Sequence, residues 1–120
     1  MVLIENLELE YEETEKFLKK VKKGMISAEE KNTLYLLVMQ LKNRTETQKE
    51  RFLLYFNLKP NESNNYKFTE LGKIQGCSSN AIRYSIIRIR SALANLKHEK
   101  REIFVRLVKD CNKRRENDVF

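Results

Sequence analysis

YKFTELGKIQGCSSNAIRYSIIRIRSALANL, residues 66–96, contains two runs of apolar residues at helical spacing, one on each side of Gly76. In the first run, Phe68, Leu71 and Ile74 are spaced to line one face of a short helix. The second run follows Ser78, a good N-cap, and its apolar residues recur at intervals of three and four: Ile82, Ile86, Ile89, Leu93 and Leu96. The stretch therefore predicts a short helix, a tight turn and a longer helix.

Two glycines favour a sharp corner between these helices. Gly76 lies where the turn needs a positive φ, which glycine adopts at the least cost. Gly72 comes four residues earlier and is small enough to let the two helix backbones approach closely. This layout is that of a helix-turn-helix, in which the second helix enters the major groove of DNA. An ordinary helical hairpin with a polar outer face is the alternative.

Polar side chains open the second helix and are expected to face outward. Hydroxyl, amide, phenol and guanidinium groups can all hydrogen-bond base edges or phosphates. The DNA-binding residues predicted here are Ser78, where the helix begins, and Ser79, Asn80, Arg83 and Tyr84, which would face bases. Four further cations are expected to contact phosphates or to supply flanking charge: Arg88, Arg90, Lys67 and Lys73.

The segment FTELGKIQGCSSNAIRYSIIRIRSALANLKH, residues 68–98, resembles the C-terminal domain of bacterial sigma factors that reads the minus-35 promoter element. The features in common are the run Glu70–Lys73, then Ser78, the pair Ile82-Arg83 and the basic, aliphatic tail Arg88–Leu96. Upstream, ETQKERFLLYFNL, residues 46–58, is similar to the helix that precedes this motif in the family. The resemblance covers residues 45–98, which is under half of the chain.

This resemblance implies duplex DNA as a ligand and RNA polymerase as a further partner, since such domains bind a flexible tip on its large subunit. Arg83 is of the same chemical type as the residue that the family carries at the matching position. Ser79, Asn80 and Tyr84 differ from the residues that housekeeping sigma factors carry at the matching positions. The resemblance therefore implies the fold and the groove-binding mode more strongly than the standard minus-35 sequence preference.

The basic charge of the chain is concentrated in the same half as this motif. Residues 1–40 hold eight acids and six bases, a net charge of −2, whereas residues 41–120 hold nine acids and eighteen bases, a net charge of +9. A basic surface on a helix-turn-helix is typical of a protein that binds a polyanion such as double-stranded DNA. A solvated surface with no ligand is the alternative interpretation.

Nothing in the sequence indicates catalysis. Cys77 and Cys111 have no partner at metal-binding spacing, His98 is the single histidine, and no phosphate-binding loop or catalytic triad stands out. We therefore expect no enzyme activity, no cofactor and no metal site. The sequence has no apolar run long enough to span a membrane and no basic leader before an apolar segment, so a cytoplasmic location is expected.

Helices are also predicted on both sides of the motif. Residues 3–25 have an apolar stripe of Leu7, Tyr11, Thr14, Leu18, Val21 and Met25, with Phe17 beside it. Capping boxes are predicted at Ser27 with Glu30 and at Thr47 with Glu50. A last stripe consists of Ile103, Phe104, Leu107, Val108 and Cys111. It needs cover from the N-terminal helix, a second copy of the chain or another protein.

The sequence thus predicts an all-α fold with a sigma-like helix-turn-helix. Residues 1–44 would form an N-terminal helical segment, residues 45–98 the DNA-binding domain and residues 99–120 a C-terminal helical extension. The leading function hypothesis is a sequence-specific DNA-binding transcription regulator. It could act with RNA polymerase or as a homodimer through its N- and C-terminal helices. The alternative hypothesis is a protein-interaction or RNA-associated accessory module that keeps the same fold without specific DNA readout.

Overall fold

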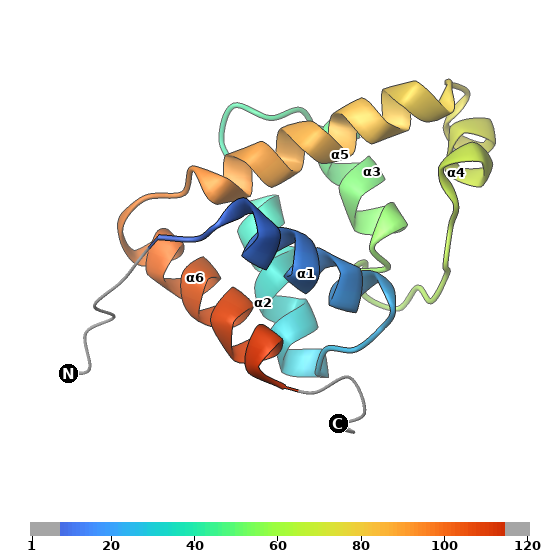
Figure 1. Cartoon of the computed structure of the whole chain (residues 1–120). Coiled ribbons are helices and arrows are strands. Elements are labelled where there is room, and N and C mark those ends of the chain that lie inside the picture. The colour runs from blue at the N-terminus through green and yellow to red at the C-terminus, as the bar shows by residue number, and fades with distance from the viewer. Residues whose placement is uncertain (1–7, 115–120) are drawn as a thin grey trace.

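The computed structural model describes residues 8–114, and this part of the chain consists of helices and their connections, with no strand (Figure 1). The helices are α1 (Tyr11–Lys22), α2 (Ala28–Met39), α3 (Glu46–Tyr55), α4 (Phe68–Gln75), α5 (Ser79–Ala94) and α6 (His98–Lys113). The predicted all-helical class is confirmed. Within residues 8–114, no helix has both the length and the apolar character that crossing a bilayer requires.

Helix α1 is shorter than the predicted helix over residues 3–25. It begins at Tyr11, because the side chain of Glu13 accepts a hydrogen bond from the Glu10 backbone N–H at 2.9 Å and so caps the helix there. Leu7 lies outside the described residues. Tyr11 is 60% exposed, so placing it on the buried stripe was wrong, whereas Phe17 is fully buried and forms the centre of the inner face.

The two predicted capping boxes have different outcomes. Ser27 and Glu30 cap α2 as expected, with the Glu30 backbone N–H 3.1 Å from Ser27 Oγ. The prediction for α3 was wrong by two residues, because Thr45 is the N-cap and its Oγ1 lies 3.1 Å from the Gln48 backbone nitrogen. Asn43 has a left-handed backbone with φ 62°, which turns the chain just before Thr45 and fixes the earlier start.

A single hydrophobic core spans all six helices and is continuous across the three segments defined from the sequence. Helix α6 folds back against α1, and the rings of Phe17 and Phe104 meet edge to face with centroids 6.1 Å apart. The stripe is therefore covered from within the same chain, by α1 together with α2, and Phe104, Leu107, Val108 and Cys111 are all buried. Ile103 is an exception and stays 42% exposed.

The connection between α4 and α5 is a tight corner. Helix α4 ends at Gly76 in the left-handed conformation, with φ 68°, and the Cys77 backbone N–H donates to the Gly72 carbonyl oxygen at 2.8 Å. A Cβ added to Gly72 would lie 2.7 Å from the Cys77 carbonyl oxygen, which confirms the close approach expected there. Ser78 caps α5 through its Oγ, 3.1 Å from the Ala81 backbone nitrogen.

One of the predictions for the inner face of α4 is wrong. Ile74 is 60% exposed, whereas Leu71 and Gly72 are buried and Phe68 is half-buried. The short helix packs through a face centred between Leu71 and Gly72, because the missing side chain of Gly72 lets α5 approach on that side. Ile74 lies to one side of this face and points to solvent.

Candidate nucleic-acid interface

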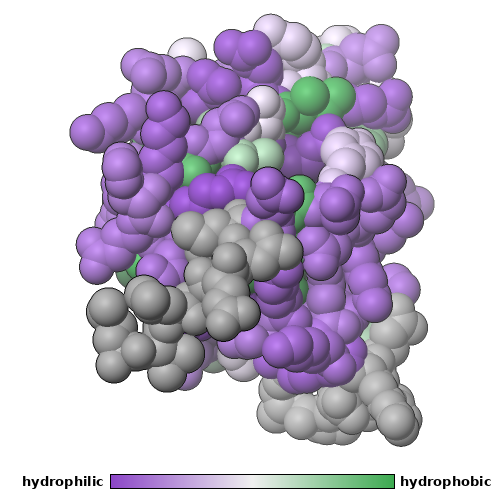
Figure 2. All heavy atoms as spheres, turned by 60° about the vertical axis from the view of Figure 1, so that its left-hand side comes forward, coloured by the Kyte–Doolittle hydropathy of each residue, from purple (hydrophilic) through white to green (hydrophobic). Residues whose placement is uncertain are grey.

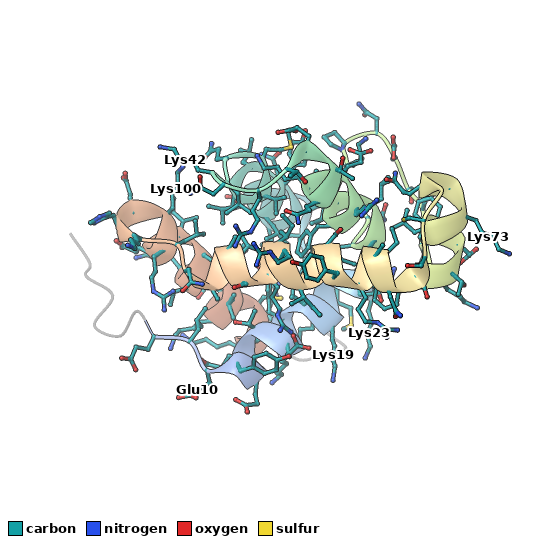
Figure 3. The ribbon with its side chains drawn as sticks, turned by 90° about the horizontal axis from the view of Figure 1, so that it is seen from above. Glu10, Lys19, Lys23, Lys42, Lys73 and Lys100 are labelled. Atoms are coloured by element: carbon teal, nitrogen blue, oxygen red, sulfur yellow. The ribbon has the colours of Figure 1, made fainter. Side chains whose placement is uncertain are left out.

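Helix α5 crosses one side of the molecule, and in the view from above no other helix covers its outer surface (Figure 3). Its inner surface is buried through Ile82, Ser85, Ile86, Ile89 and Leu93. Its 16 residues include three arginines and no carboxylate. Any ligand that approaches the outer surface of α5 therefore meets positive charge and hydrogen-bonding groups.

The predicted base-contacting residues occupy two different sides of α5. Asn80 and Tyr84 are exposed on the outermost row, and the Arg88 guanidinium carbon lies 5.9 Å from the centre of the Tyr84 ring. Ser79 is half-buried, and the Oγ of Ser78 is already used to cap the helix. The structure therefore brings Asn80, Tyr84 and Arg88 together and leaves the two serines at the edge.

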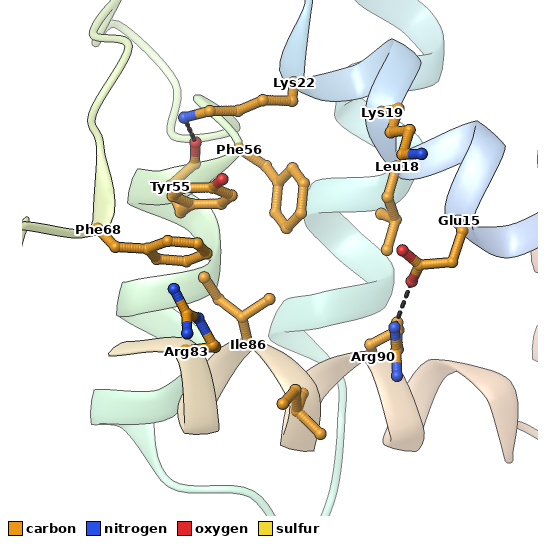
Figure 4. A pocket seen from close by; sticks show the side chains of 11 residues that line it. Glu15, Leu18, Lys19, Lys22, Tyr55, Phe56, Phe68, Arg83, Ile86 and Arg90 are labelled. Carbon is orange, nitrogen blue, oxygen red and sulfur yellow. Dashed lines mark hydrogen bonds and ion pairs between the residues drawn. The ribbon is translucent and has the colours of Figure 1, made fainter. Parts of the chain in front are cut away.

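Arg83 lies on the side of α5 that faces α1, which we call the α1 flank. Its guanidinium carbon is 5.0 Å from the centre of the Phe68 ring, which stacks on Tyr55 with ring centroids 4.4 Å apart. Lys22 closes the stack, with its Nζ 3.8 Å from the centre of the Tyr55 ring. Two cations thus enclose two aromatic rings, and Arg83 is oriented by a favourable cation–π contact (Figure 4).

Lys22 is held firmly in this stack. Its Nζ donates to the backbone carbonyl oxygens of Tyr55 and Tyr66, both at 2.6 Å. Burial lowers the pKa of Lys22, and the nearby carboxylate of Glu70 partly offsets that effect. The stack borders an open hollow of about 300 Å³ between α1, α3, α4 and α5, which is also lined by Arg90 (Figure 4).

Arg90 also belongs to the α1 flank, and the protein itself already binds it. Its guanidinium donates to the Tyr11 hydroxyl at 2.6 Å and to a carboxylate oxygen of Glu15, and it lies over the Tyr11 ring at 4.5 Å. Burial alone would lower the pKa of Arg90, but the hydrogen bonds to Tyr11 and Glu15, together with the electrostatic attraction of both groups, outweigh burial and raise it. The predicted phosphate-contacting residue is therefore partly neutralised by α1.

The opposite side of α5 faces the connection between α2 and α3, and we call it the loop flank. Arg44 lies there and donates from Nε to the Arg88 backbone carbonyl oxygen at 3.1 Å. The remaining predicted residues are Lys67, the N-cap of α4, and Lys73, on α4, and both are exposed. No sequence pattern indicated that Lys42 would meet Lys97 and Lys100 at the other end of α5, since Lys42 lies far from both in the chain.

Metal binding and cysteine reactivity were two further kinds of chemistry considered from the sequence. Residues 8–114 contain no group of three or more histidine, cysteine or acidic side chains that could hold a metal ion. Cys111 is buried, and burial raises the pKa of its thiol, which disfavours the reactive thiolate. No protein-family model, curated protein or solved structure matches this chain. Function is therefore inferred from the residues and the geometry described above.

Proposed function

We propose that this chain is a sequence-specific DNA-binding transcription regulator in which α4 and α5 act as a sigma-like helix-turn-helix. The observation that carries this proposal is the uncovered outer face of α5, which has the exposed amide of Asn80, the phenol of Tyr84 and the guanidinium of Arg88, on a helix with no carboxylate. A face of this kind matches the acceptor-rich edges of bases and the charge of phosphates. The corner at Gly72 and Gly76 supports α5 at a fixed angle to α4.

In this proposal, Asn80 and Tyr84 contact base edges from the outermost row of α5. The Asn80 amide can make a paired hydrogen bond to adenine, and a good contact of this kind is worth about 1–3 kcal/mol of discrimination. Ile87 lies on the same side of the helix and is 46% exposed, so it offers an apolar contact to a thymine methyl group. Sequence reasoning had assigned no role to Ile87.

Arg83 would contact a guanine or an adjacent phosphate from the α1 flank, where its stacking on Phe68 limits the conformations it can adopt. Arg88, Lys67 and Lys73 would contact phosphates. These contacts release counterions, so the affinity for DNA would fall steeply as the salt concentration rises. Arg90 would contribute less than Arg88, because Glu15 already binds it.

Selection of bound duplexes from a random DNA pool tests the proposal. We expect an enriched motif, and we expect Asn80→Ala and Arg83→Ala each to relax the preference at one or two of its positions. The control is Lys73→Ala, which should weaken binding to the motif and to scrambled DNA by the same factor. Equal affinity of the wild-type protein for the motif and for scrambled DNA would refute sequence-specific readout.

The alternative is an accessory module that binds protein or RNA, and the exposed apolar surface of Tyr84 and Ile87 favours it, since aromatic side chains often anchor interfaces. A gel-shift comparison of duplex DNA with structured RNA at one salt concentration separates the nucleic-acid classes. Sedimentation separates a homodimer from a monomer. Mutual burial of the apolar faces of α1 and α6 supports a monomer, which suits a protein that acts on DNA together with RNA polymerase.

A further inference from the structure

A basic hollow of about 480 Å³ lies at the C-terminal end of α5, between the α2–α3 connection and the first turn of α6. Four cationic side chains line it, and they are Lys42, Arg44, Lys97 and Lys100. No carboxylate is among its lining residues. Lys42 and Lys100 lie on the same side of α5 in the view from above, opposite Glu10 and Lys19 (Figure 3). Figure 2 turns this end of the molecule toward the viewer, and most of the residues visible there are hydrophilic.

Within the described residues, no carboxylate neutralises the cations of the basic hollow, and one of them, Arg44, is held in place by the backbone. Arg44 donates from Nε to the Arg88 carbonyl oxygen at 3.1 Å and from Nη1 to the Asn43 carbonyl oxygen at 2.7 Å. Carbonyl groups fix the guanidinium but carry no net charge to cancel its own. Within residues 8–114, Lys42, Lys97 and Lys100 make no side-chain hydrogen bond or ion pair. Other cations, such as Lys59 and Arg106, have carboxylate partners.

Two turns of the backbone bring the four cationic side chains of the basic hollow together. Asn43 has φ 62°, which turns the α2–α3 connection toward the end of α5, and Asn95 ends α5 with its Nδ2 2.8 Å from the Ser91 carbonyl oxygen. The C-terminus of α5 and the N-terminus of α6 both lie beside the hollow, so their opposite helix dipoles offset each other there. The side-chain charges therefore dominate, and their mutual repulsion is relieved only by an anion from outside the chain.

We propose that the basic hollow binds a backbone phosphate of the same DNA duplex whose major groove receives the start of α5, and this rests on the function proposed above. The hollow lies 15 residues beyond Asn80, which is roughly 22 Å along the helix axis. The major groove is only about 12 Å wide. When the first turns of α5 lie in the groove, its far end therefore reaches the flanking sugar–phosphate backbone. The hollow anchors the duplex without reading its sequence.

A charge-matched comparison tests this anchor. The variant K42Q/K97Q/K100Q removes three positive charges from the hollow. Its control, K31Q/K109Q/K113Q, removes three from the first turn of α2 and the last turns of α6, the end of the molecule farthest from α5 in Figure 1. Fluorescence anisotropy with a duplex that carries the selected motif gives the affinity at several salt concentrations. The thermal unfolding midpoint of each variant shows whether it folds, and relief of repulsion should leave that of the hollow variant unchanged or raised.

We expect the hollow variant to lose at least tenfold in affinity at low salt, and the slope of log affinity against log salt to become shallower by about 1–2. Its preference for the motif over scrambled DNA should be unchanged. The control variant should change the slope by less than half as much. Equal slopes for the two variants would overturn the anchor while leaving the proposed function intact. Wild-type protein that binds no duplex would overturn both.

A second measurement locates the contact on the DNA and on the protein. Duplexes trimmed on one side of the motif should bind wild-type protein more weakly, but trimming should make no difference to the hollow variant. In spectra of ¹⁵N-labelled full-length protein, inorganic pyrophosphate should shift the Asn43 and Leu96 amides saturably, and the variant should lose those shifts. Pyrophosphate binding combined with no dependence on the DNA flank would assign the hollow to a free anion and overturn the DNA anchor.

Discussion

Cations lie on both flanks of α5, but they have different partners within the protein. On the α1 flank, Arg83 stacks on Phe68 and Arg90 is bound by Tyr11 and Glu15. On the loop flank, Arg44 contacts only neutral carbonyl groups, and no carboxylate lines the adjoining basic hollow. The difference depends on α1, which brings a carboxylate beside one flank and does not reach the other. Whether a cation is available to a ligand therefore depends on whether an acidic helix packs beside it. The sequence around the cation does not show this.

This asymmetry has an energetic consequence for ligand binding. A phosphate that approaches Arg90 must compete with Glu15, and two opposite charges 4 Å apart attract by about 1 kcal/mol in water and about 4 kcal/mol near a protein surface. A phosphate that approaches the loop flank meets no such competitor. We therefore expect bound DNA to contact the loop flank more closely than the α1 flank.

The largest effect is expected from a substitution that removes the packing that holds α1 in place. Phe104→Ala deletes a fully buried ring that packs on Phe17 and holds α1 against α6. We expect the free energy of unfolding to fall by about 3–5 kcal/mol, measured by urea denaturation with circular dichroism. Ile103→Ala is the matched control, because this neighbour is largely exposed and should cost less than about 1 kcal/mol. Equal losses for the two would contradict the proposed packing of α1.

A milder change disturbs the corner on which the α1 flank depends. In Gly72→Ala, the new Cβ would lie 2.7 Å from the Cys77 carbonyl oxygen, so the backbone of α4 or of the turn must move. We expect this strain, about 1–3 kcal/mol, to exceed the gain of up to about 1 kcal/mol in helix propensity. The amide shifts should spread through α4 and the Phe68–Arg83 stack and leave Asn43 unchanged. A net gain in stability would show that the corner is looser than described.

Arg88→Ala and Arg90→Ala compare an arginine of the outermost row, whose backbone carbonyl contacts Arg44 of the loop flank, with an arginine of the α1 flank. Loss of Arg88 should lower the affinity for every duplex about tenfold at low salt and reduce the salt slope by about 0.9, as expected for one lost phosphate contact. Loss of Arg90 should reduce the slope by clearly less, because Glu15 already binds that guanidinium. Anisotropy titrations at several salt concentrations measure both slopes. A larger change for Arg90 would reverse the assignment of the flanks.

The smallest expected effect comes from making the α1 flank resemble the loop flank. Glu15→Gln removes the carboxylate that binds Arg90, so the affinity for duplex DNA should rise about two- to threefold at low salt and the salt slope should steepen. Stability should change by less than about 1 kcal/mol, since the pair is partly exposed. Glu12→Gln removes the same charge from a neighbouring exposed position and is the control. Equal gains for the two would attribute the effect to net charge alone.

Much of the fold could be predicted, because local rules determine it. The spacing of Ile82, Ile86, Ile89 and Leu93 gave the buried face of α5, and Ser27 with Glu30 gave the start of α2. The start of α3 was misplaced because residues 45–48 and 47–50 both match the capping pattern, and only the turn at Asn43 selects the first. Ile74 was misplaced because the inner face of a two-turn helix depends on which neighbour packs against it.

The candidate site was predictable in part. Its exposed polar row, with Asn80, Tyr84 and Arg88, follows from the helical period once the buried face of α5 is known. The contact of Arg90 with Glu15 joins residues 75 positions apart, and the basic hollow joins Lys42 to Lys100. Such contacts depend on how helices cross, which no local pattern specifies. The sequence pattern therefore does not indicate which arginine of α5 is bound by an acidic side chain of α1.

Lys20 lies in the last turn of α1 with Lys19 and Lys22, yet only 4% of it is exposed. Its Nζ donates to the carbonyl oxygens of Cys111 at 2.9 Å and Arg114 at 2.6 Å, so it closes the end of α6. An acylating reagent should therefore modify Lys20 far more slowly than the exposed amines of the chain, and only when the end of α6 separates from α1. Mass spectrometry of the modified protein would give the rate at which Lys20 reacts. That rate would report how often the end of α6 separates from α1, with no introduced label.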